Sequence, residues 1–251
     1  MNTQVVTVDP STIPWKSLAL EGGGTVDLQM YLKGADGGPE AIRAKICEGY
    51  EVEPHFHLAA QFQLLLEGTM TFPTFKLDAP AVHYTEHNVP YGPFVVNQGH
   101  DMLVLHTKPG GVILMRDKEQ RRQANARGRE LTCCAHEVEW EPMPGHPGAR
   151  RKVLIPASQG PSAELIECPP QMELIVPVST YGRYEVLYRG SVLVEGKELG
   201  PKGVRFVSAG QPAAPLTCGP AGASVIVLTY DADAAQSYGG STEEVLARME
   251  Q

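Results

Sequence analysis

Several features that mark common protein classes are missing from this chain of 251 residues. No apolar run approaches the roughly 18 residues of a membrane span, and residues 1–11 lack the positive charge and apolar core of a signal peptide. A phosphate-binding glycine loop, a dinucleotide fingerprint and a nucleophile elbow are also absent. Basic residues are few, 21 against 29 acidic ones, and the net charge of −8 argues against a nucleic-acid partner. We therefore expect a cytoplasmic protein that binds neither nucleic acid nor membrane.

Cysteine and histidine are limited in ways that bear on chemistry. The five cysteines are odd in number and lack metal-finger spacing, as expected of reduced thiols in the cytosol. All eight histidines lie between His55 and His146, and none follows. If the two halves of the chain share a fold, they cannot share metal chemistry that depends on imidazole.

An internal duplication is indicated by landmarks that recur half a chain apart. The only two tryptophans, Trp15 and Trp140, each precede a glycine-rich loop and an extended apolar stretch. Turn glycines then follow at similar distances, Gly68 and Gly92 after the first tryptophan and Gly190 and Gly210 after the second. Two similar units in tandem explain this register.

Both units have the composition of an all-β fold. Short segments rich in Val, Leu, Ile, Tyr and Phe, punctuated by glycine and proline, predict strands in a sandwich or barrel. The predicted strands include 62–66, 89–97, 102–106, 185–194, 204–208 and 224–230. Helix signals are confined to two places. Charged residues 116–130, within the connector 116–138, are expected to be helical in part, and 241–249 is expected to form a short helix because Ser241 and Glu244 have capping-box spacing. The expected domains are therefore 1–115 and 139–251.

The segment that ends at Gly68 carries a distinctive pair of histidines. It reads Gly49, five residues, His55, Phe56, His57, three residues, Gln61, six residues and Gly68. The pattern resembles the first signature of the cupin superfamily, in which two histidines and a nearby carboxylate or amide bind a divalent metal inside a small β-barrel. Residues i and i+2 of a strand point to the same face, so both imidazoles are expected to enter the barrel. We predict His55, His57 and Gln61 as metal ligands, with Gln63 as a competitor for the amide position.

The second cupin signature resembles Pro90, Tyr91, Gly92, Pro93, Phe94, Val95 and Asn97. In the family the third histidine usually stands where this chain has Val95. His87 and His106 are candidates for the missing ligand or, together with Tyr84, for a general base. The other histidines of the region fit less well, namely His83 and His100. The apolar lining of the barrel is expected from Phe62, Leu64, Leu66, Val95 and Met102.

The same register applied to the second unit predicts a barrel without a metal. It places Pro177, Ser179 and Arg183 where the first unit has His55, His57 and Gln61, and Ala213 at the place of the third histidine. Such a barrel would serve packing, dimerisation or binding. The lead-in to each unit, Pro14 with Trp15 and Trp140 with Pro142, resembles that of cupins of the anti-sigma-factor and acetylacetone-cleaving dioxygenase type.

The resemblance implies two tandem cupin (jelly-roll) β-barrels joined by a short connector, with a short C-terminal helix. It also implies a metal-dependent enzyme acting on a small oxygenated organic molecule, such as an enolised diketone or hydroxy-ketone, as a dioxygenase first and an isomerase or lyase next. Iron is the expected ion, with manganese, nickel or zinc as alternatives. The alternative is a non-enzymatic binding or structural bicupin. A homodimer is expected, because cupins commonly pair through exposed strand edges.

Overall fold

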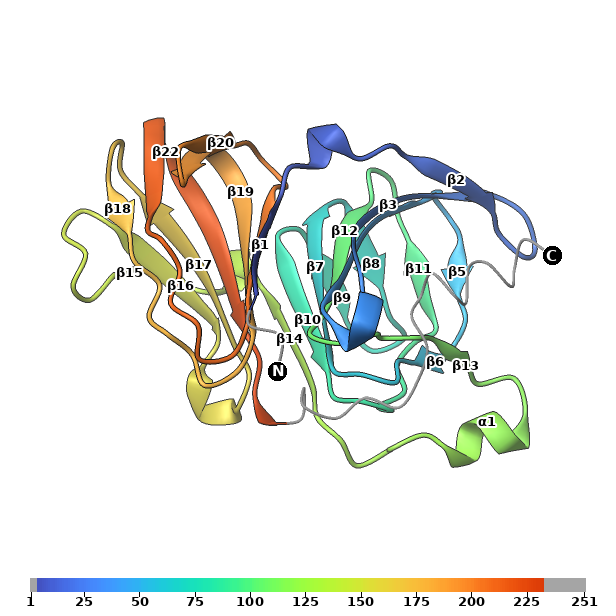
Figure 1. Ribbon diagram of the computed structural model, residues 1–251. Coiled ribbons are helices and arrows are strands. Elements are labelled where there is room, and N and C mark those ends of the chain that lie inside the picture. Colours follow the sequence, from blue (N-terminus) through green and yellow to red (C-terminus); the bar gives the residue numbers. More distant parts are fainter. Residues whose placement is uncertain (1–3, 233–251) are drawn as a thin grey trace. The chain divides into compact units, whose positions relative to one another are not determined.

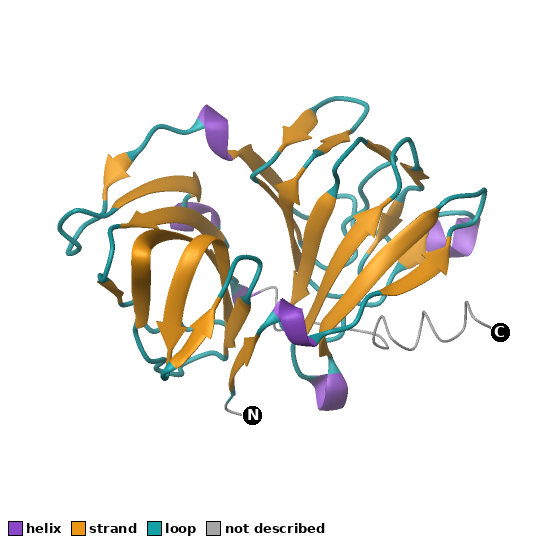
Figure 2. Ribbon diagram, turned by 90° about the horizontal axis from the view of Figure 1, so that it is seen from above, coloured by secondary structure: helices purple, strands orange, loops and turns teal. Residues whose placement is uncertain are grey.

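The computed structural model describes residues 4–232, and strands make up nearly all of the regular structure there (Figure 2). The chain divides into two compact units. We call Ile13–Cys134 the N-terminal barrel, and Ala135–Asp231 together with the residues before Ile13 the C-terminal barrel. Among the described residues, no helix has the length and apolar character needed to cross a membrane. The helix expected at 241–249 lies outside the described residues.

The N-terminal barrel is built on one large antiparallel sheet and two smaller ones (Figure 1). Its strands are β2 (Lys16–Ala19), β3 (Thr25–Lys33), β4 (Glu40–Ile46), β5 (Glu51–Val52), β6 (His55–Phe56), β7 (Gln61–Glu67), β8 (Thr69–Thr71), β9 (Lys76–Asp78), β10 (Ala81–Thr85), β11 (Phe94–Val96), β12 (Asp101–His106), β13 (Ile113–Leu114) and β14 (Glu130–Cys134). The large sheet has the order β14-β10-β7-β12-β4-β3-β2, and the smaller ones are β5-β11-β8-β9 and β13-β6. The α-helix α1 (Lys118–Arg122) and the 3-10 turn η2 (Ala35–Gly37) lie between strands.

The C-terminal barrel repeats this arrangement. Its strands are β1 (Val5–Val8), β15 (Glu141–Pro142), β16 (Arg150–Ile155), β17 (Ser162–Cys168), β18 (Glu173–Leu174), β19 (Arg183–Val194), β20 (Lys197–Leu199), β21 (Val204–Val207) and β22 (Leu216–Thr229), with 3-10 turns η1 (Pro10–Thr12), η3 (Ala135–Glu137) and η4 (Ala157–Gln159). The main path through its sheet is β1-β21-β19-β22-β17-β16-β15. Position by position, this is the order of the large N-terminal sheet, which confirms the predicted all-β duplication.

Side-chain contacts repeat together with the strands. Phe62 on β7 contacts Tyr84 on β10 with ring centroids 4.9 Å apart, and Tyr184 on β19 contacts Phe206 on β21 at the same 4.9 Å. The two pairs exchange phenylalanine for tyrosine at matching register positions. Strands β7, β10 and β12 therefore correspond to β19, β21 and β22.

The outermost strand of each large sheet comes from the segment that precedes the other barrel. Strand β1 pairs with β21, although the chain then enters the N-terminal barrel. Strand β14 pairs with β10, although the chain then enters the C-terminal barrel. The boundaries differ here from the expected domains, because residues 130–134 of the expected connector form a strand of the N-terminal barrel. Hydrophobic patterning shows that a segment is a strand but does not show its partner.

Only part of the rest of the connector is α-helical, the five residues of α1 (Lys118–Arg122), in agreement with the partial helix expected there. Helix α1 has no buried residue and begins with a capping box: the Asp117 side chain accepts from the Gln120 backbone N–H at 2.9 Å, and the Asp117 N–H donates to the Gln120 side chain at 3.1 Å. The capping box satisfies backbone donors that an isolated short helix would leave to water.

Strand β7 decides which side chains line the N-terminal barrel. Gln61, Gln63 and Leu65 face the interior, where Leu65 packs in a core cluster with residues from both the large sheet and β8, β9 and β11. Because strand side chains alternate, Phe62 and its neighbours Leu64 and Leu66 lie on the opposite face, which is also buried. The prediction that Phe62, Leu64 and Leu66 line the barrel is therefore wrong, because these side chains point to the other face of the sheet.

Strand β11 is shorter than predicted and presents different residues. Only Phe94–Val96 is extended, because Pro90 and Pro93 lack backbone donors and Gly92 has a left-handed φ of 87°. Phe94 and Val96 belong to the interior cluster, whereas Val95 is partly exposed between them. Val95 therefore does not line the barrel, but the predicted lining residue Met102 does.

Candidate functional site

The interior face of β7 and β10 gathers polar side chains that are almost completely buried. His55 is 5% exposed, Gln61 0%, Gln63 3%, His83 1% and Tyr91 4%. They are surrounded by the apolar cluster around Leu65, Phe72, Phe94 and Met102. Buried polar groups cost free energy unless they find partners, so their hydrogen bonds define what this cluster can do.

The hydroxyl group of Tyr91 is at the centre of this polar cluster. It lies 2.7 Å from Nε2 of His55 and accepts from Nε2 of Gln63 at 2.6 Å. The other ring nitrogen of His55, Nδ1, lies 2.7 Å from the carbonyl oxygen of Glu53. A carbonyl only accepts, so Nδ1 carries the proton and Nε2 presents a lone pair to the Tyr91 hydroxyl. The segment that contains Tyr91 is held there by two backbone bonds with His55, at 3.0 and 3.1 Å.

His83 extends the hydrogen-bond chain toward the surface. Its Nδ1 lies 2.8 Å from Oε1 of Gln63, and its Nε2 lies 2.9 Å from Oε1 of Glu130 on β14. The Glu130 side chain is 35% exposed, whereas that of His83 is 1% exposed. The His83 ring also contacts the Tyr91 ring edge-on, with centroids 4.9 Å apart. His83, a weaker candidate from its place in the sequence, is therefore part of the polar cluster.

His57 and His106 lie beside this chain. The His57 ring centroid is 5.5 Å from that of His55 and 5.1 Å from that of His106. The Gly111 backbone accepts a hydrogen bond from the His57 ring, and Nδ1 of His57 is buried without a hydrogen-bond partner in the described part of the chain. Nδ1 of His106 lies 3.3 Å from the Ala60 carbonyl oxygen. The structure thus brings the imidazoles of His55, His57 and His106 into one neighbourhood.

Gln61 contributes a second buried acceptor. Its side-chain amide donates to Oγ1 of Thr85 at 3.1 Å, and its Oε1 atom has no hydrogen-bond partner within residues 4–232. An unpartnered buried acceptor loses its hydration without compensation. Gln61 Oε1 and His57 Nδ1 are therefore two buried atoms without a hydrogen-bond partner in the described residues, whereas His55 Nε2 is bonded to Tyr91.

Burial favours the uncharged form of three of these imidazoles, those of His55, His57 and His106. It lowers the pKa of His55 to about 4, against the opposing effect of the hydrogen bond to Glu53. Burial also lowers the pKa of His57 well below its usual value, helped by nearby His106, and lowers the pKa of His106 itself. For Tyr91, burial raises the pKa of the hydroxyl. At neutral pH these three imidazoles and the Tyr91 phenol are therefore neutral.

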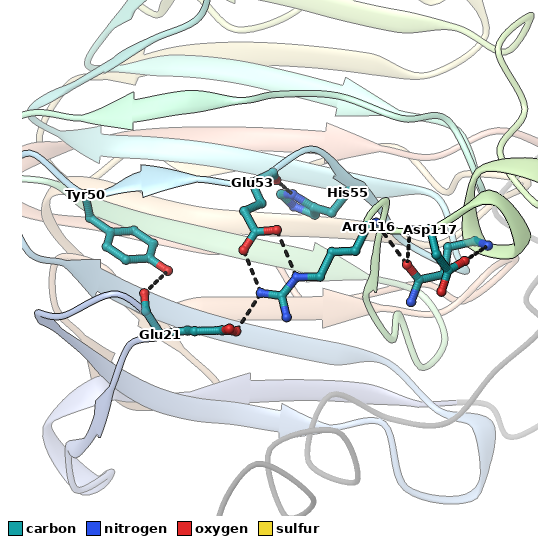
Figure 3. Close-up of polar contacts among 7 residues, drawn as sticks. Glu21, Tyr50, Glu53, His55, Arg116 and Asp117 are labelled. Atoms are coloured by element: carbon teal, nitrogen blue, oxygen red, sulfur yellow. Dashed lines mark hydrogen bonds and ion pairs between the residues drawn. The ribbon is translucent and has the colours of Figure 1, made fainter.

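A surface network fixes the loop that leads into the histidine pair (Figure 3). Arg116, just before α1, donates through Nε and Nη2 to the Glu53 carboxylate at 2.9 and 2.6 Å, and through Nη2 to Glu21 at 2.6 Å. Tyr50 donates to the carbonyl oxygen of Glu21 at 3.2 Å. These groups are exposed, so the network adds little stability. Its effect is positional, because the backbone carbonyl of Glu53 is the one that orients His55.

Two of the predicted catalytic residues lie elsewhere. Tyr84 does not join His106 in the cluster: it alternates with His83 on β10 and packs on Phe62, on the opposite face of the sheet. His87 lies in the turn after β10 instead of on a strand, and is partly exposed. The next residue, Asn88, donates its backbone N–H to the His57 carbonyl at 2.7 Å, so this turn is close to the site.

Within residues 4–232, no three side chains of His, Cys, Asp or Glu form a group that could hold a metal ion. Any ion in this barrel would therefore need the amide oxygen of Gln61 or the hydroxyl of Tyr91 in addition to the imidazoles. Both are oxygen donors, and the Tyr91 hydroxyl lies beside His55, so such a donor set would be neutral and mixed.

Two tandem jelly-roll barrels with this order of strands define the bicupin fold. Solved structures with the same fold include a proposed dioxygenase from Nostoc punctiforme, with 13% identity, 96% of this chain and 89% of that chain covered and a TM-score of 0.70. The oxalate decarboxylase of Lactobacillus farciminis has 12% identity, 99% and 91% coverage and a TM-score of 0.63. Procruciferin, an 11S globulin of Brassica napus, has 10% identity, 92% and 85% coverage and a TM-score of 0.61. No protein-family model and no curated protein sequence matches the chain.

At these identities the similarity establishes the fold and leaves the activity to the site. The matching proteins carry names of enzymes and of a globulin, so the fold by itself does not decide between catalysis and another role. The function has to be inferred from the residues inside the N-terminal barrel.

Proposed function

We propose that the N-terminal barrel binds one divalent metal ion and acts on a small oxygenated organic molecule, with dioxygenase chemistry as the first expectation. The ligand atoms would be Nε2 of His55, Nδ1 of His57 and Oε1 of Gln61. The observation that carries the proposal is that two of these atoms are buried acceptors without a partner among the described residues. A cation would relieve the cost of leaving them unsatisfied.

The chemistry of the donors favours a first-row transition metal. Neutral imidazole suits iron, manganese, nickel and zinc, and an amide oxygen completes a site that is not specific for one of them. Iron remains the first expectation, because dioxygenase chemistry requires a metal that can also react with oxygen. When bound, such an ion would polarise a substrate carbonyl or hold an enolate through two oxygens.

The protein's own residues would orient the substrate and its protons. The Tyr91 hydroxyl, released from His55 when that imidazole binds an ion, still accepts from Gln63 at 2.6 Å and can donate to a substrate oxygen. His106 is adjacent to His57, so it remains the candidate for a further ligand or for the general base. Apolar side chains of the core cluster, including Phe72 and Phe94, exclude water from the reacting groups.

Metal analysis of the purified protein tests the proposal. We expect about one equivalent of a first-row metal in the wild type and its loss in His57→Ala. His136→Ala removes an exposed histidine from the C-terminal barrel and should retain the metal. A wild-type protein that stays metal-free after reconstitution with Fe²⁺, Mn²⁺ and Ni²⁺ would contradict the proposal.

Oxygen consumption separates the expected reaction types. An oxygen electrode with a panel of enolisable diketones and hydroxy-ketones should show substrate-dependent uptake if the barrel is a dioxygenase. Turnover of the same compounds under nitrogen would instead indicate an isomerase or lyase. The expected homodimer can be examined on the same preparation by light scattering.

A specific observation favours a second candidate, a non-enzymatic bicupin. The Tyr91 hydroxyl lies where it satisfies His55 Nε2 at 2.7 Å, so the polar cluster is partly complete without any ion. In that case Tyr91, Gln63 and His83 would serve as a buried hydrogen-bond network that specifies the packing of the core. Absence of metal together with full stability of the metal-free wild type would favour this alternative.

A further inference from the structure

The interior of the C-terminal barrel holds a charged cluster at the place where the N-terminal barrel has its polar one. Arg183 on β19 pairs with Thr229 on β22 as Gln61 pairs with His106. Glu185 faces Arg205 on β21 as Gln63 faces His83. The strand register therefore gives Arg183, Glu185 and Arg205 positions equivalent to those of Gln61, Gln63 and His83, respectively.

These three side chains are more deeply buried than their charge would suggest. Arg183 is 1% exposed, Glu185 2% and Arg205 1%. Charged groups are rarely buried to this extent unless their charges are paired.

One carboxylate serves both guanidinium groups. Arg183 donates through Nε to Oε1 of Glu185 at 2.9 Å, and Arg205 donates through Nε to Oε2 at 2.6 Å. Arg205 also contacts the same carboxylate through Nη2 and donates through Nη1 to the Ala214 carbonyl at 2.6 Å. Among the described residues, Glu185 is the one carboxylate that either arginine contacts, so the three side chains together carry one net positive charge.

The excess charge lies on the Arg183 side. Its Nη2 reaches the carbonyl oxygen of Val176 only at 3.5 Å. Its Nη1 is buried and has no hydrogen-bond partner anywhere in the described residues. By contrast, each of the three nitrogens of the Arg205 guanidinium has a partner. A buried guanidinium nitrogen without an acceptor combines an unmade hydrogen bond with an uncompensated charge.

The geometry points to an anion-binding site in the C-terminal barrel, in which Nη1 of Arg183 binds a small planar monoanion of the carboxylate class. A monoanion supplies the missing charge, and a carboxylate oxygen supplies the missing acceptor. A dianion would overcompensate a net charge of one. This site is separate from the metal site proposed above, because every residue that forms it belongs to the C-terminal barrel.

Thermal unfolding in sodium formate tests this inference. At constant ionic strength, set with sodium chloride, the wild-type midpoint should rise with formate and saturate. The rise should be about 5 °C at a formate concentration about 100-fold above the dissociation constant. Arg183→Gln should abolish the rise, since the remaining Glu185 and Arg205 form a neutral pair.

Two control variants show whether the formate response belongs to this site. Arg150→Gln removes an exposed arginine of the same barrel, which pairs with Glu167, and should keep the formate response. His57→Ala should also keep it, so a failure of the proposed metal site would leave this result unchanged. An equal rise in chloride, a rise that persists in Arg183→Gln, or no rise at all would overturn the inference.

A crystal structure of the wild type grown in formate keeps the inference testable if Arg183→Gln fails to fold. We expect a planar anion within hydrogen-bonding distance of Arg183 Nη1. An empty position there at saturating formate would overturn the inference.

Discussion

Replacing Tyr91 by phenylalanine tests the proposed metal site, in which a hydroxyl group and a metal ion would compete for the imidazole of His55. Phenylalanine keeps the ring, whose centroid is 4.3 Å from that of His55 and 4.9 Å from that of His83. It removes the hydroxyl that bonds Nε2 of His55 at 2.7 Å and Nε2 of Gln63 at 2.6 Å. The variant therefore changes polar contacts while leaving the packing in place.

The two readouts should move in opposite directions. In the metal-free protein, Tyr91→Phe leaves one buried acceptor on His55 and one buried donor on Gln63 without a partner, at about 1–3 kcal/mol each. The lower desolvation cost of phenylalanine offsets part of this loss, so the free energy of unfolding should fall by about 3 kcal/mol. At the proposed site a metal ion would satisfy the orphaned His55 acceptor, so the variant should bind the ion about tenfold more tightly, equivalent to about 1.4 kcal/mol.

Urea denaturation of chelator-treated protein measures the first effect, and calorimetric titration with Mn²⁺ or Ni²⁺ measures the second. Tyr50→Phe is the matched control, because its hydroxyl donates only to the carbonyl of Glu21 near the surface. It should change stability by less than about 1 kcal/mol and leave the metal affinity unchanged. Weaker metal binding by Tyr91→Phe would refute the reasoning and make Tyr91 a ligand.

Three further variants examine features outside this hydrogen bond. Gly110→Ala would bring a Cβ within 2.4 Å of Nε2 of the buried His106 ring, and should lower the free energy of unfolding in urea by about 1–3 kcal/mol. Burial lowers the pKa of His100 to about 4, below the 6.5 of an exposed histidine, so it contributes stability that is present above pH 6.5 and lost as the pH falls toward 4. In His100→Asn, the free energy of unfolding should change with pH by up to about 3 kcal/mol less between pH 6.5 and 4 than in the wild type. The same pH dependence in both proteins would show that this ring does not titrate as inferred. Glu185→Gln strands two buried guanidinium groups and should cost about 3–5 kcal/mol in the same assay, whereas Glu167→Gln, on an exposed ion pair, should cost less than about 1 kcal/mol.

The positions of the strands along the chain were largely predictable from the sequence, because each depends on the local hydrophobic pattern. The predicted segments 62–66, 102–106 and 204–208 match β7, β12 and β21 to within one residue at either end. The alignment of the two units, which gave Arg183 the position equivalent to that of Gln61, was also correct, because turn glycines fix the register of a hairpin. Strand exchange between the barrels was not predictable, because edge pairing leaves no mark on the pattern of either segment.

The side chains that form the site were harder to predict, because the sequence does not show which face of a strand points into the barrel. On β7, both faces are buried, so apolar character did not distinguish Phe62 from Leu65. Pairing β10 with β7 would have placed His83 opposite Gln63 and so inside the barrel. Tyr91 lies in a proline-interrupted loop, where the alternation rule gives no direction, and its position became evident only from the backbone bonds with His55.

The exchanged edge strands also bear on how the chain is made and cut. Strand β1 is synthesised before the N-terminal barrel and its partner β21 only after it, so the C-terminal sheet cannot be completed until the whole of the intervening chain has been made. A fragment that stops at residue 115 would expose β10 as an open edge, a site for aggregation, whereas one spanning 13–134 carries β14 to cover it. Fragments intended to isolate either barrel should therefore follow the pairing of the strands and not their order along the chain.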